Sequence, residues 1–174
     1  STATSSDAGN ITLKVQDSIA LAGEGSGVFA NTEVGSTGNG GSILTQEQIP
    51  QTVIIRDGAN IAVNSNGSGQ GGNITLAAEE LTLDNSSITA ETTSNRGGNI
   101  TLNVEDILRF VNDGEITATA GTAQAGGDGG NVTIDSDFIL AFPTNNNYQI
   151  TANAFEGDGG NIQLTTNSFF GSEF

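Results

Sequence analysis

Apolar and polar residues alternate along this chain in short stretches that recur at a regular distance. In residues 73–98, three apolar pairs are each separated by one polar residue: Ile74 and Leu76, Leu81 and Leu83, and Ile88 and Ala90. A period of two predicts strands with one buried face, and the polar stretches between the pairs predict turns. We therefore expect three strands in this unit.

The unit repeats. The hexapeptide GGNITL stands at 71–76 and 97–102, with looser copies at 8–13, 40–45, 129–134 and 159–164. A spacing of 26–32 residues indicates stacked units, the two-residue period argues against a helical solenoid, and propeller blades need about 40–45 residues. We predict one all-β domain over 1–174. It is a right-handed, single-stranded parallel β-helix (β-solenoid) of five to six coils with three strands each, and the coils start near residues 9, 41, 72, 98, 130 and 160.

The hexapeptide itself is interpreted as a corner followed by a strand. Equivalent residues of successive coils in a parallel stack lie about 4.8 Å apart, so identical side chains meet. Each asparagine is expected to donate to the coil above and accept from the coil below, as stacked Asn does in cross-β structures. The glycine pair is expected to adopt positive φ at the corner. The predicted ladder consists of Asn10, Asn73, Asn99, Asn131 and Asn161.

Length differences between the repeats fall in three stretches that we expect to form loops. They are residues 23–39 in the first coil, 45–51 in the second and 141–148 in the fifth. Both prolines, Pro50 and Pro143, lie in these stretches, where no ladder N–H is needed.

Composition limits the function. The 174 residues include 20 acidic and 4 basic ones, for a net charge of −16, which argues against binding nucleic acid or anionic lipid. There is no Cys for a disulfide or a thiolate metal site. No apolar run approaches the roughly 18–20 residues of a membrane-spanning helix, so membrane insertion is not expected.

Candidates for catalysis are few. Without His or Cys, imidazole bases and thiol nucleophiles are excluded. A glycosidase needs two carboxylates roughly 5–10 Å apart, and Asp135 and Asp137 could project from one strand face. Glu79–Glu80 and Glu105–Asp106 are adjacent acidic pairs, and Arg109 is the one basic residue near Asp106. Solvated outer-face charges are the favoured interpretation, so we expect no enzyme and no catalytic residue.

A metal site is considered at one corner. GDGGN occurs at 127–131 and 157–161, which places Asp128 and Asp158 one coil apart, and Ca²⁺ favours such oxygen ligands. The tandem calcium-binding nonapeptide of repeat toxins is missing, so an ordinary polar turn is favoured over a Ca²⁺ site and no cofactor is expected.

Three aromatic residues and a threonine column are candidates for recognition. Phe142, Tyr148 and Phe155 lie around the loop of the fifth coil, where they would either stack on glycans or pack the loop onto the shaft. Thr89, Thr117 and Thr151 share one column, but only 117–119 shows the paired Thr-x-Thr typical of ice-binding solenoids. Glycosylation sequons at several ladder asparagines are interpreted as part of the ladder instead.

Three long segments of the chain, 7–43, 53–63 and 127–174, also carry a resemblance to a known family. They include DAGNITLKVQDSIALAGEGSGVFANTEVGSTGNGGSI, VIIRDGANIAV and ILAFP…ITANAFEGDGGNI. They resemble the β-helical shafts of filamentous haemagglutinin-like exoproteins of two-partner secretion, most of all the cyanobacterial repeat type. The resemblance implies a right-handed parallel β-helix, export through an outer-membrane partner transporter, a secreted or cell-surface location, and adhesion to surface glycans or other cells. The family's N-terminal secretion domain has no counterpart here, so the chain is expected to be a shaft segment.

The expected function is therefore structural: a rigid, acidic spacer in a secreted or surface-anchored adhesin. A carbohydrate-binding or carbohydrate-active β-helix, similar to polysaccharide lyases or glycosidases, is the alternative. A third possibility is end-to-end self-association into filaments, because the two ends would expose unpaired strand edges.

Overall fold

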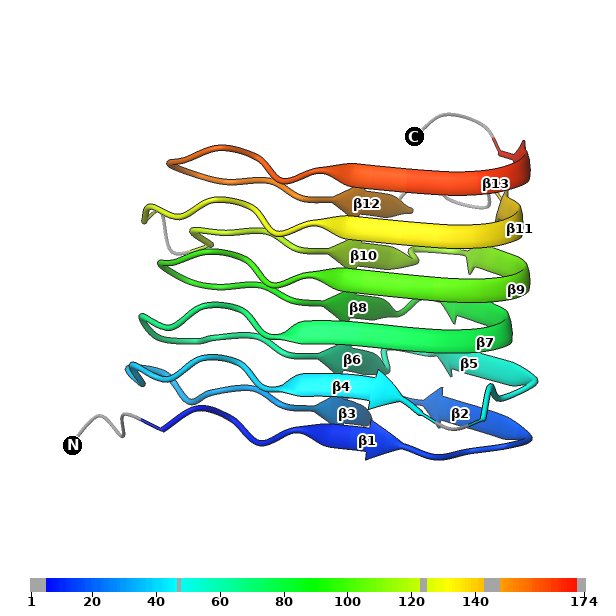
Figure 1. Ribbon diagram of the computed structural model, residues 1–174, viewed down its shortest axis with the longest axis horizontal. Coiled ribbons are helices and arrows are strands. Elements are labelled where there is room, and N and C mark those ends of the chain that lie inside the picture. The colour runs from blue at the N-terminus through cyan, green and yellow to red at the C-terminus, as the bar shows by residue number, and fades with distance from the viewer. Residues whose placement is uncertain (1–5, 47, 123–124, 143–147, 172–174) are drawn as a thin grey trace.

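The fold is a parallel β-solenoid. The computed structural model describes residues 6–46, 48–122, 125–142 and 148–171, and it contains strands but no helix in these ranges. Every strand pairing among them is parallel. The chain runs along the near face in Figure 1, returns along the far face and climbs, which is a right-handed path. The predicted all-β parallel β-helix is confirmed.

Two sheets face each other across the core. The larger sheet (sheet A) contains β1 (Ile11–Leu13), β4 (Ser42–Thr45), β7 (Asn73–Asp84), β9 (Ile100–Val111), β11 (Val132–Phe142) and β13 (Ile162–Phe170), with β2 (Ser18–Ala22) and β5 (Thr52–Arg56) beside them. The smaller sheet (sheet B) stacks β3 (Gly27–Phe29), β6 (Asn60–Ala62), β8 (Ser87–Thr89), β10 (Glu115–Thr117) and β12 (Gln149–Thr151). The first strand of each coil begins one or two residues after its predicted start.

The prediction of three strands per coil applies to the first two coils alone. In β7, β9 and β11 the first two predicted strands join into one, and their pairing shifts register at Ala78/Glu80 and at Ser136/Phe138. Such irregularities bend a strand, so one strand follows two sides of the coil. In the second coil, residues 46–51 lie between β4 and β5.

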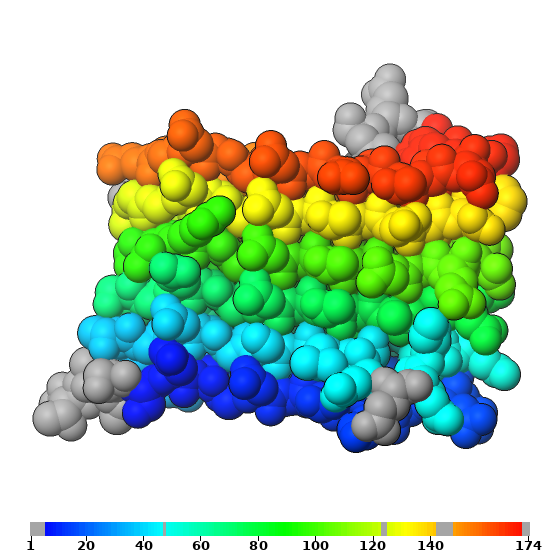
Figure 2. Space-filling model, in the orientation of Figure 1, coloured from blue at the N-terminus to red at the C-terminus, as the bar shows by residue number. Residues whose placement is uncertain are grey.

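The core consists of aliphatic columns, as the alternation predicts. One column consists of the first aliphatic residue of each hexapeptide copy: Ile43, Ile74, Ile100 and Val132 pair in register and are all fully buried. Burying one Ile or Leu side chain stabilises by about 1.5–3 kcal/mol, and each middle coil buries several. Figure 2 shows the coils as successive bands of colour, each in contact with the next.

The glycine pair is needed for close stacking, and the predicted positive φ is wrong. None of the paired glycines has φ in the left-handed region. Instead, the N–H of Gly98 donates across the coil to the carbonyl of Ala90 (2.8 Å), and Gly130 does the same to Ala118 (2.8 Å). A Cβ on Gly98 would lie 2.7 Å from the carbonyl carbon of Gly72 and closer still to its oxygen. The glycines therefore let the two sides of the coil approach each other closely, and this constriction at the glycine pairs is called the pinch below.

Residues other than glycine adopt positive φ at another corner, after the second side of the coil. Asp57, Asn85 and Asn112 adopt φ of 57°, 46° and 53°. Asn and Asp tolerate this conformation better than other residues with a Cβ. The predicted turn at Asn85 is therefore a left-handed corner, repeated in three successive coils.

Beyond the pinch lies a second, smaller lobe, in which single bridges join successive coils from Thr32 to Ser65, Thr92, Ala120 and Ala154. Its interior is polar. The buried hydroxyl of Ser65 donates to Gly38 O (3.2 Å), and that of Thr92 donates to Gly69 O (2.9 Å). The prediction that 23–39 is only a loop is wrong, because β3 and the Thr32 bridge lie within it. The fifth-coil stretch lies mostly outside the described residues, at 143–147.

Candidate functional site

The ladder asparagines lie on the outside of the pinch. Oδ1 of Asn73 accepts both the backbone N–H and the side-chain amide of Asn99 (3.1 Å each), and Oδ1 of Asn99 accepts the same pair from Asn131 (3.1 and 3.2 Å). Oδ1 of Asn131 accepts the N–H of Asn161 (3.0 Å). Each asparagine therefore donates to the asparagine of the preceding coil, whereas donation to the following coil was expected. A backbone N–H can only donate, so the lower amide must present its oxygen.

The lower end of this ladder includes a serine. Oδ1 of Asn10 accepts the N–H of Ser42 at 2.9 Å, so the first asparagine bonds to the next coil. Ser42 pairs with Asn73 in the sheet register. Its short side chain interrupts the amide ladder between the second and third coils.

Two further ladders were not predicted. In the second lobe, Oδ1 of Asn31 accepts the N–H of Asn64 (2.7 Å), and Oδ1 of Asn64 accepts that of Glu91 (2.8 Å). Both asparagines precede a bridge residue, and this common position was the signal in the sequence. The other ladder joins Oδ1 of Asp7 to the N–H of Asn39 (2.7 Å) and Oδ1 of Asn39 to that of Gln70 (2.9 Å).

The candidate metal residues form a step of the same kind. Oδ1 of Asp128 accepts the backbone N–H of Asp158 at 3.0 Å. The preceding residues, Gly127 and Gly157, both have positive φ. Within the described ranges, no three His, Cys, Asp or Glu side chains lie close enough together to hold a metal ion. The favoured interpretation of an ordinary polar turn and the alternative of a Ca²⁺ site both stay untested.

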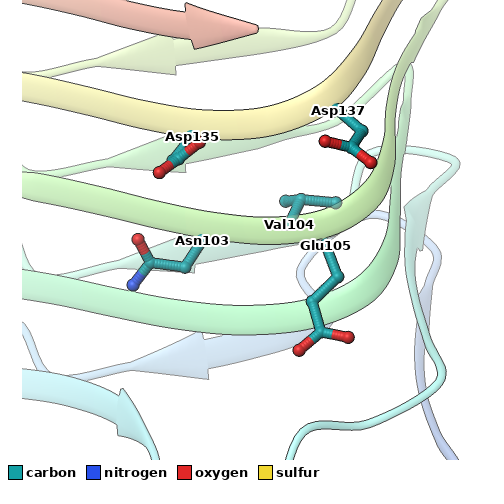
Figure 3. Close-up of a pocket in the computed structure, with 5 residues that line it drawn as sticks. All are labelled: Asn103, Val104, Glu105, Asp135 and Asp137. Atoms are coloured by element: carbon teal, nitrogen blue, oxygen red, sulfur yellow. The ribbon is translucent and has the colours of Figure 1, made fainter. Parts of the chain in front are cut away.

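The candidate carboxylates border a shallow hollow on the outer face of sheet A (Figure 3). Its volume is about 210 Å³, and its lining contains Asn103, Val104, Glu105, Asp135 and Asp137. Asp135 and Asp137 thus lie on one face of β11, as their spacing predicts. The Glu105 carboxylate points away from both of them (Figure 3). The three acids do not converge on one point.

Two of the charged candidates have structural partners. Oδ1 of Asp137 accepts the side-chain amide of Asn167 one coil above, at 2.8 Å. Nη1 of Arg109 lies 2.7 Å from Oε2 of Glu80 one coil below, in a partly exposed ion pair. Arg109, the one basic residue near Asp106 in the sequence, thus forms its ion pair with Glu80. These contacts join neighbouring coils along the outer face.

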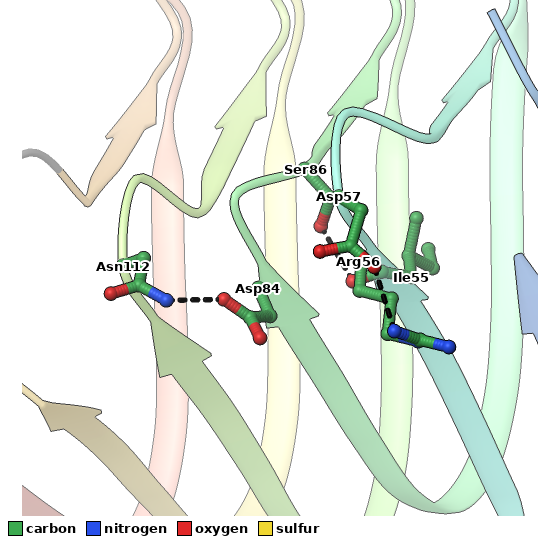
Figure 4. Close-up of polar contacts among 6 residues, drawn as sticks. All are labelled: Ile55, Arg56, Asp57, Asp84, Ser86 and Asn112. Atoms are coloured by element: carbon green, nitrogen blue, oxygen red, sulfur yellow. Dashed lines mark hydrogen bonds and ion pairs between the residues drawn. The ribbon is translucent and has the colours of Figure 1, made fainter. Parts of the chain in front are cut away.

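The left-handed corner carries a similar set of contacts (Figure 4). The Asn112 side-chain amide donates to the Asp84 carboxylate, and the buried Ser86 hydroxyl donates to the Ile55 carbonyl (2.8 Å). Arg56 and Asp57 form an exposed ion pair at 2.7 Å. Asparagine, serine and aspartate at this corner thus join one coil to the next.

The two described aromatic candidates, Tyr148 and Phe155, differ in exposure. Tyr148 is buried, and its ring centroid lies 6.4 Å from that of Phe110, which agrees with the packing alternative for this residue and not with glycan stacking. It packs the end of the fifth-coil loop onto the core. Phe155 is 58% exposed on the second lobe. The side chain of Phe142 lies outside what the structure describes.

Two residues of the threonine column are buried, and one of them, Thr117, bonds to a carboxyl group with a raised pKa. Thr89 and Thr117 are buried, so they do not form an exposed ice-binding face. The hydroxyl of Thr151 donates to that of Thr117 (2.9 Å), which donates to the Glu91 carboxylate (3.2 Å). Burial raises the pKa of Glu91, the Thr117 hydrogen bond lowers it in part, and the nearby Glu115 charge raises it.

Comparison with protein-family models, curated proteins and solved structures finds no match. A helix of the length and hydropathy needed to cross a bilayer is not found among the described residues. The geometry of the chain therefore carries the functional argument. The polar groups with defined partners mostly link one coil to the next.

Proposed function

We propose that this chain is a structural shaft segment of a secreted or cell-surface adhesin. The observation that carries the proposal is that successive coils provide each other's partners on every side. The asparagine ladders, the Arg109–Glu80 pair and the Asn112–Asp84 bond all join adjacent levels. A body built in this way is stiff along its axis and is extended by adding levels.

The resemblance to filamentous haemagglutinin-like exoproteins supports the same proposal. It also supports export through an outer-membrane partner transporter and an extracellular location. The described side chains offer no converging set of acids and bases in the hollow of Figure 3, which favours a non-catalytic role. Adhesion itself would then belong to other parts of the parent protein, which this segment holds away from the cell.

A coil deletion tests the shaft function. Removing residues 73–98 joins Gly72 to Asn99 and restores the hexapeptide GGNITL at the junction. We expect the shortened chain to fold, with the same circular dichroism per residue and a melting temperature within several degrees of the parent. In the parent exoprotein, the deletion should leave surface display intact.

Binding by the isolated segment is the result that would refute the shaft proposal. If residues 1–174 alone adhere to cells or glycans with saturable affinity, and the coil deletion abolishes it, the segment is a binding module and the shaft proposal is wrong. A deletion that unfolds the whole chain also refutes it, because a repeat shaft tolerates the loss of an internal level.

Carbohydrate binding at the hollow is the second candidate. The observation that favours it is the polar lining of this 210 Å³ depression, in which Asn103, Asp135 and Glu105 present hydrogen-bonding groups. An oligosaccharide array with the intact chain tests it. Binding that is lost in Asp135→Ala and kept in Glu33→Ala, an exposed acid on the second lobe, would support this candidate.

A further inference from the structure

Two places in the chain combine an asparagine with a following glycine: Asn39–Gly40 and Asn66–Gly67. Asparagine is thermolabile, because the backbone amide of the next residue can attack its side chain. Glycine favours this reaction most, since it has no Cβ to shield its nitrogen. Asn39–Gly40 lies at the pinch, whereas Asn66–Gly67 lies in the turn of the second lobe, directly after the bridge residue Ser65.

The two glycine amides differ in their hydrogen bonds. The N–H of Gly40 donates to the carbonyl of Gln70 in the next coil (2.9 Å). The N–H of Gly67 donates to no described residue, and the next backbone–backbone bond along the chain runs from Ser68 N–H to Ser36 O (2.9 Å). A bonded amide must first leave its acceptor before its nitrogen can approach another group, so the step at Gly67 is the less protected one.

The two asparagine side chains are held equally, so they do not decide between the steps. Nδ2 of Asn66 donates to the carbonyl of Thr32 (2.9 Å), and Oδ1 of Asn39 accepts the N–H of Gln70 (2.9 Å). Asn39 is exposed, whereas Asn66 is half-buried. Solvent access alone would therefore favour reaction at Asn39, while the hydrogen bonding of the glycine amides favours reaction at Asn66.

We propose that Asn66–Gly67 is a site of spontaneous covalent modification, at which the Asn66 side-chain amide is converted to a carboxylate. The Gly67 nitrogen gives up its proton to solvent and attacks Cγ of Asn66. A bond forms between that nitrogen and Cγ, the bond from Cγ to Nδ2 breaks, and Nδ2 leaves as ammonia after taking a proton from water. Water then opens the cyclic imide: attack at Cγ yields aspartate, and attack at the backbone carbonyl carbon yields isoaspartate. Water is the only co-reactant.

Either product disturbs the second lobe of the first two coils. The carboxylate has no hydrogen to donate to the Thr32 carbonyl, so two oxygens would face each other where a bond now joins the coils. Isoaspartate also adds one atom to the backbone path next to Gly67, where a single Cβ would already clash with the carbonyl oxygen of Ser36. Modification should therefore loosen the contact between the two coils at this turn. The inference does not depend on the shaft function proposed above.

The test is a deamidation assay on the full chain in warm, mildly alkaline buffer. A Glu-specific protease then separates Asn39 (residues 34–47) from Asn66 (residues 48–79), and tandem mass spectrometry follows the replacement of NH₂ by OH at each asparagine. We expect Asn66 to react at least about fivefold faster than Asn39, the factor that one net backbone hydrogen bond provides. In urea, which removes the fold, the two steps should react at similar rates. Hydrogen exchange should be faster at the Gly67 amide than at the Gly40 amide.

Two variants with the same change of charge test the structural consequence. Asn66→Asp loses the donor to Thr32, whereas Asn39→Asp keeps an oxygen that can accept the Gln70 N–H. We expect Asn66→Asp to speed hydrogen exchange at the Ser68 amide severalfold, and Asn39→Asp to leave it unchanged.

Three results would overturn the proposal. The first is conversion of Asn39 as fast as Asn66 or faster in the folded chain, because solvent access would then decide. The second is no conversion of Asn66 in the folded chain under conditions where both steps react in urea, because the stack would then protect it. The third is exchange at the Gly67 amide as slow as at Gly40. Equal effects of Asn66→Asp and Asn39→Asp on the Ser68 amide would refute the loosening of the turn.

Discussion

Replacing Gly98 by alanine tests the central packing argument of the fold. Gly98 is the second glycine of the pair at the third-to-fourth coil boundary, and its backbone stacks directly on that of Gly72. The new Cβ would lie 2.7 Å from the Gly72 carbonyl carbon, against an ordinary contact of 3.4–4 Å. Since the atom opposite is backbone, no side-chain rotation relieves the clash.

The magnitude follows from the hydrogen bonds at the pinch. To reach ordinary contact, the two coils must separate locally by about 1 Å or more, because protein interiors are close-packed. The hydrogen bonds from Gly71 N–H to Arg96 O (2.9 Å) and from Ile74 N–H to Asn99 O (2.9 Å), which join these two levels, and the bond from Gly98 N–H to Ala90 O (2.8 Å) would then be too long to contribute. Two or three buried bonds at about 1–3 kcal/mol each predict a loss of roughly 3–6 kcal/mol.

Chemical denaturation followed by far-ultraviolet circular dichroism measures this loss. The matched control is Gly9→Ala, at the same corner position in the first coil, where a Cβ would meet no atom within 4 Å. We expect that control to change stability by less than about 0.5 kcal/mol. Equal stability of Gly98→Ala and Gly9→Ala would refute the packing argument, since the two positions differ only in whether a coil lies beneath them.

Three more predictions concern the ladder, the buried acid and the aromatic residues. Asn99→Ala should lower the unfolding free energy by about 1–2 kcal/mol, because Asn131 loses its acceptor. Asn161→Ala, in the last described coil, should lower it by less than half of that amount. Equal losses for the two variants in urea titrations would exclude a contribution from the ladder. Glu91 has a folded-state pKa above its ordinary 4.5, so the native state binds more protons and stability falls as pH rises from 4.5 through the folded pKa. Glu91→Gln should flatten this part of the pH–stability curve, and Glu33→Gln should leave it unchanged; a curve that Glu91→Gln does not alter would contradict the desolvation argument. Tyr148→Ala should cost about 3 kcal/mol by removing a buried ring beside Phe110, while Phe155→Ala should have little effect; the reverse order in thermal melts would contradict the assignment of Tyr148 to packing.

The repeat period and the alternation of apolar residues were enough to predict the fold and the buried aliphatic column that contains Ile74 and Ile100. In a parallel stack each residue contacts its equivalent in the next coil, so a buried aliphatic position recurs in the sequence one repeat later. The union of two strands in β7, β9 and β11 could not be predicted, because a register shift leaves the two-residue alternation intact on both sides of it.

The glycine pair shows a second limit of sequence reasoning. Glycine is required both for positive φ and for close backbone approach, and a single sequence does not distinguish the two needs. The structure assigns close approach to Gly98 and left-handed φ to Asn85 and Asn112. Burial of Tyr148 was equally hidden, since its partner Phe110 lies 38 residues earlier in the chain and only the coil register brings them together.

The same repetition also limits what an internal level of the solenoid can offer to another molecule. Within the stack, a group such as the Ala118 N–H has its partner in the next coil, and a Cβ added at a paired glycine such as Gly98 meets the backbone of an adjacent level. An internal level therefore has little unsatisfied chemistry to offer a ligand.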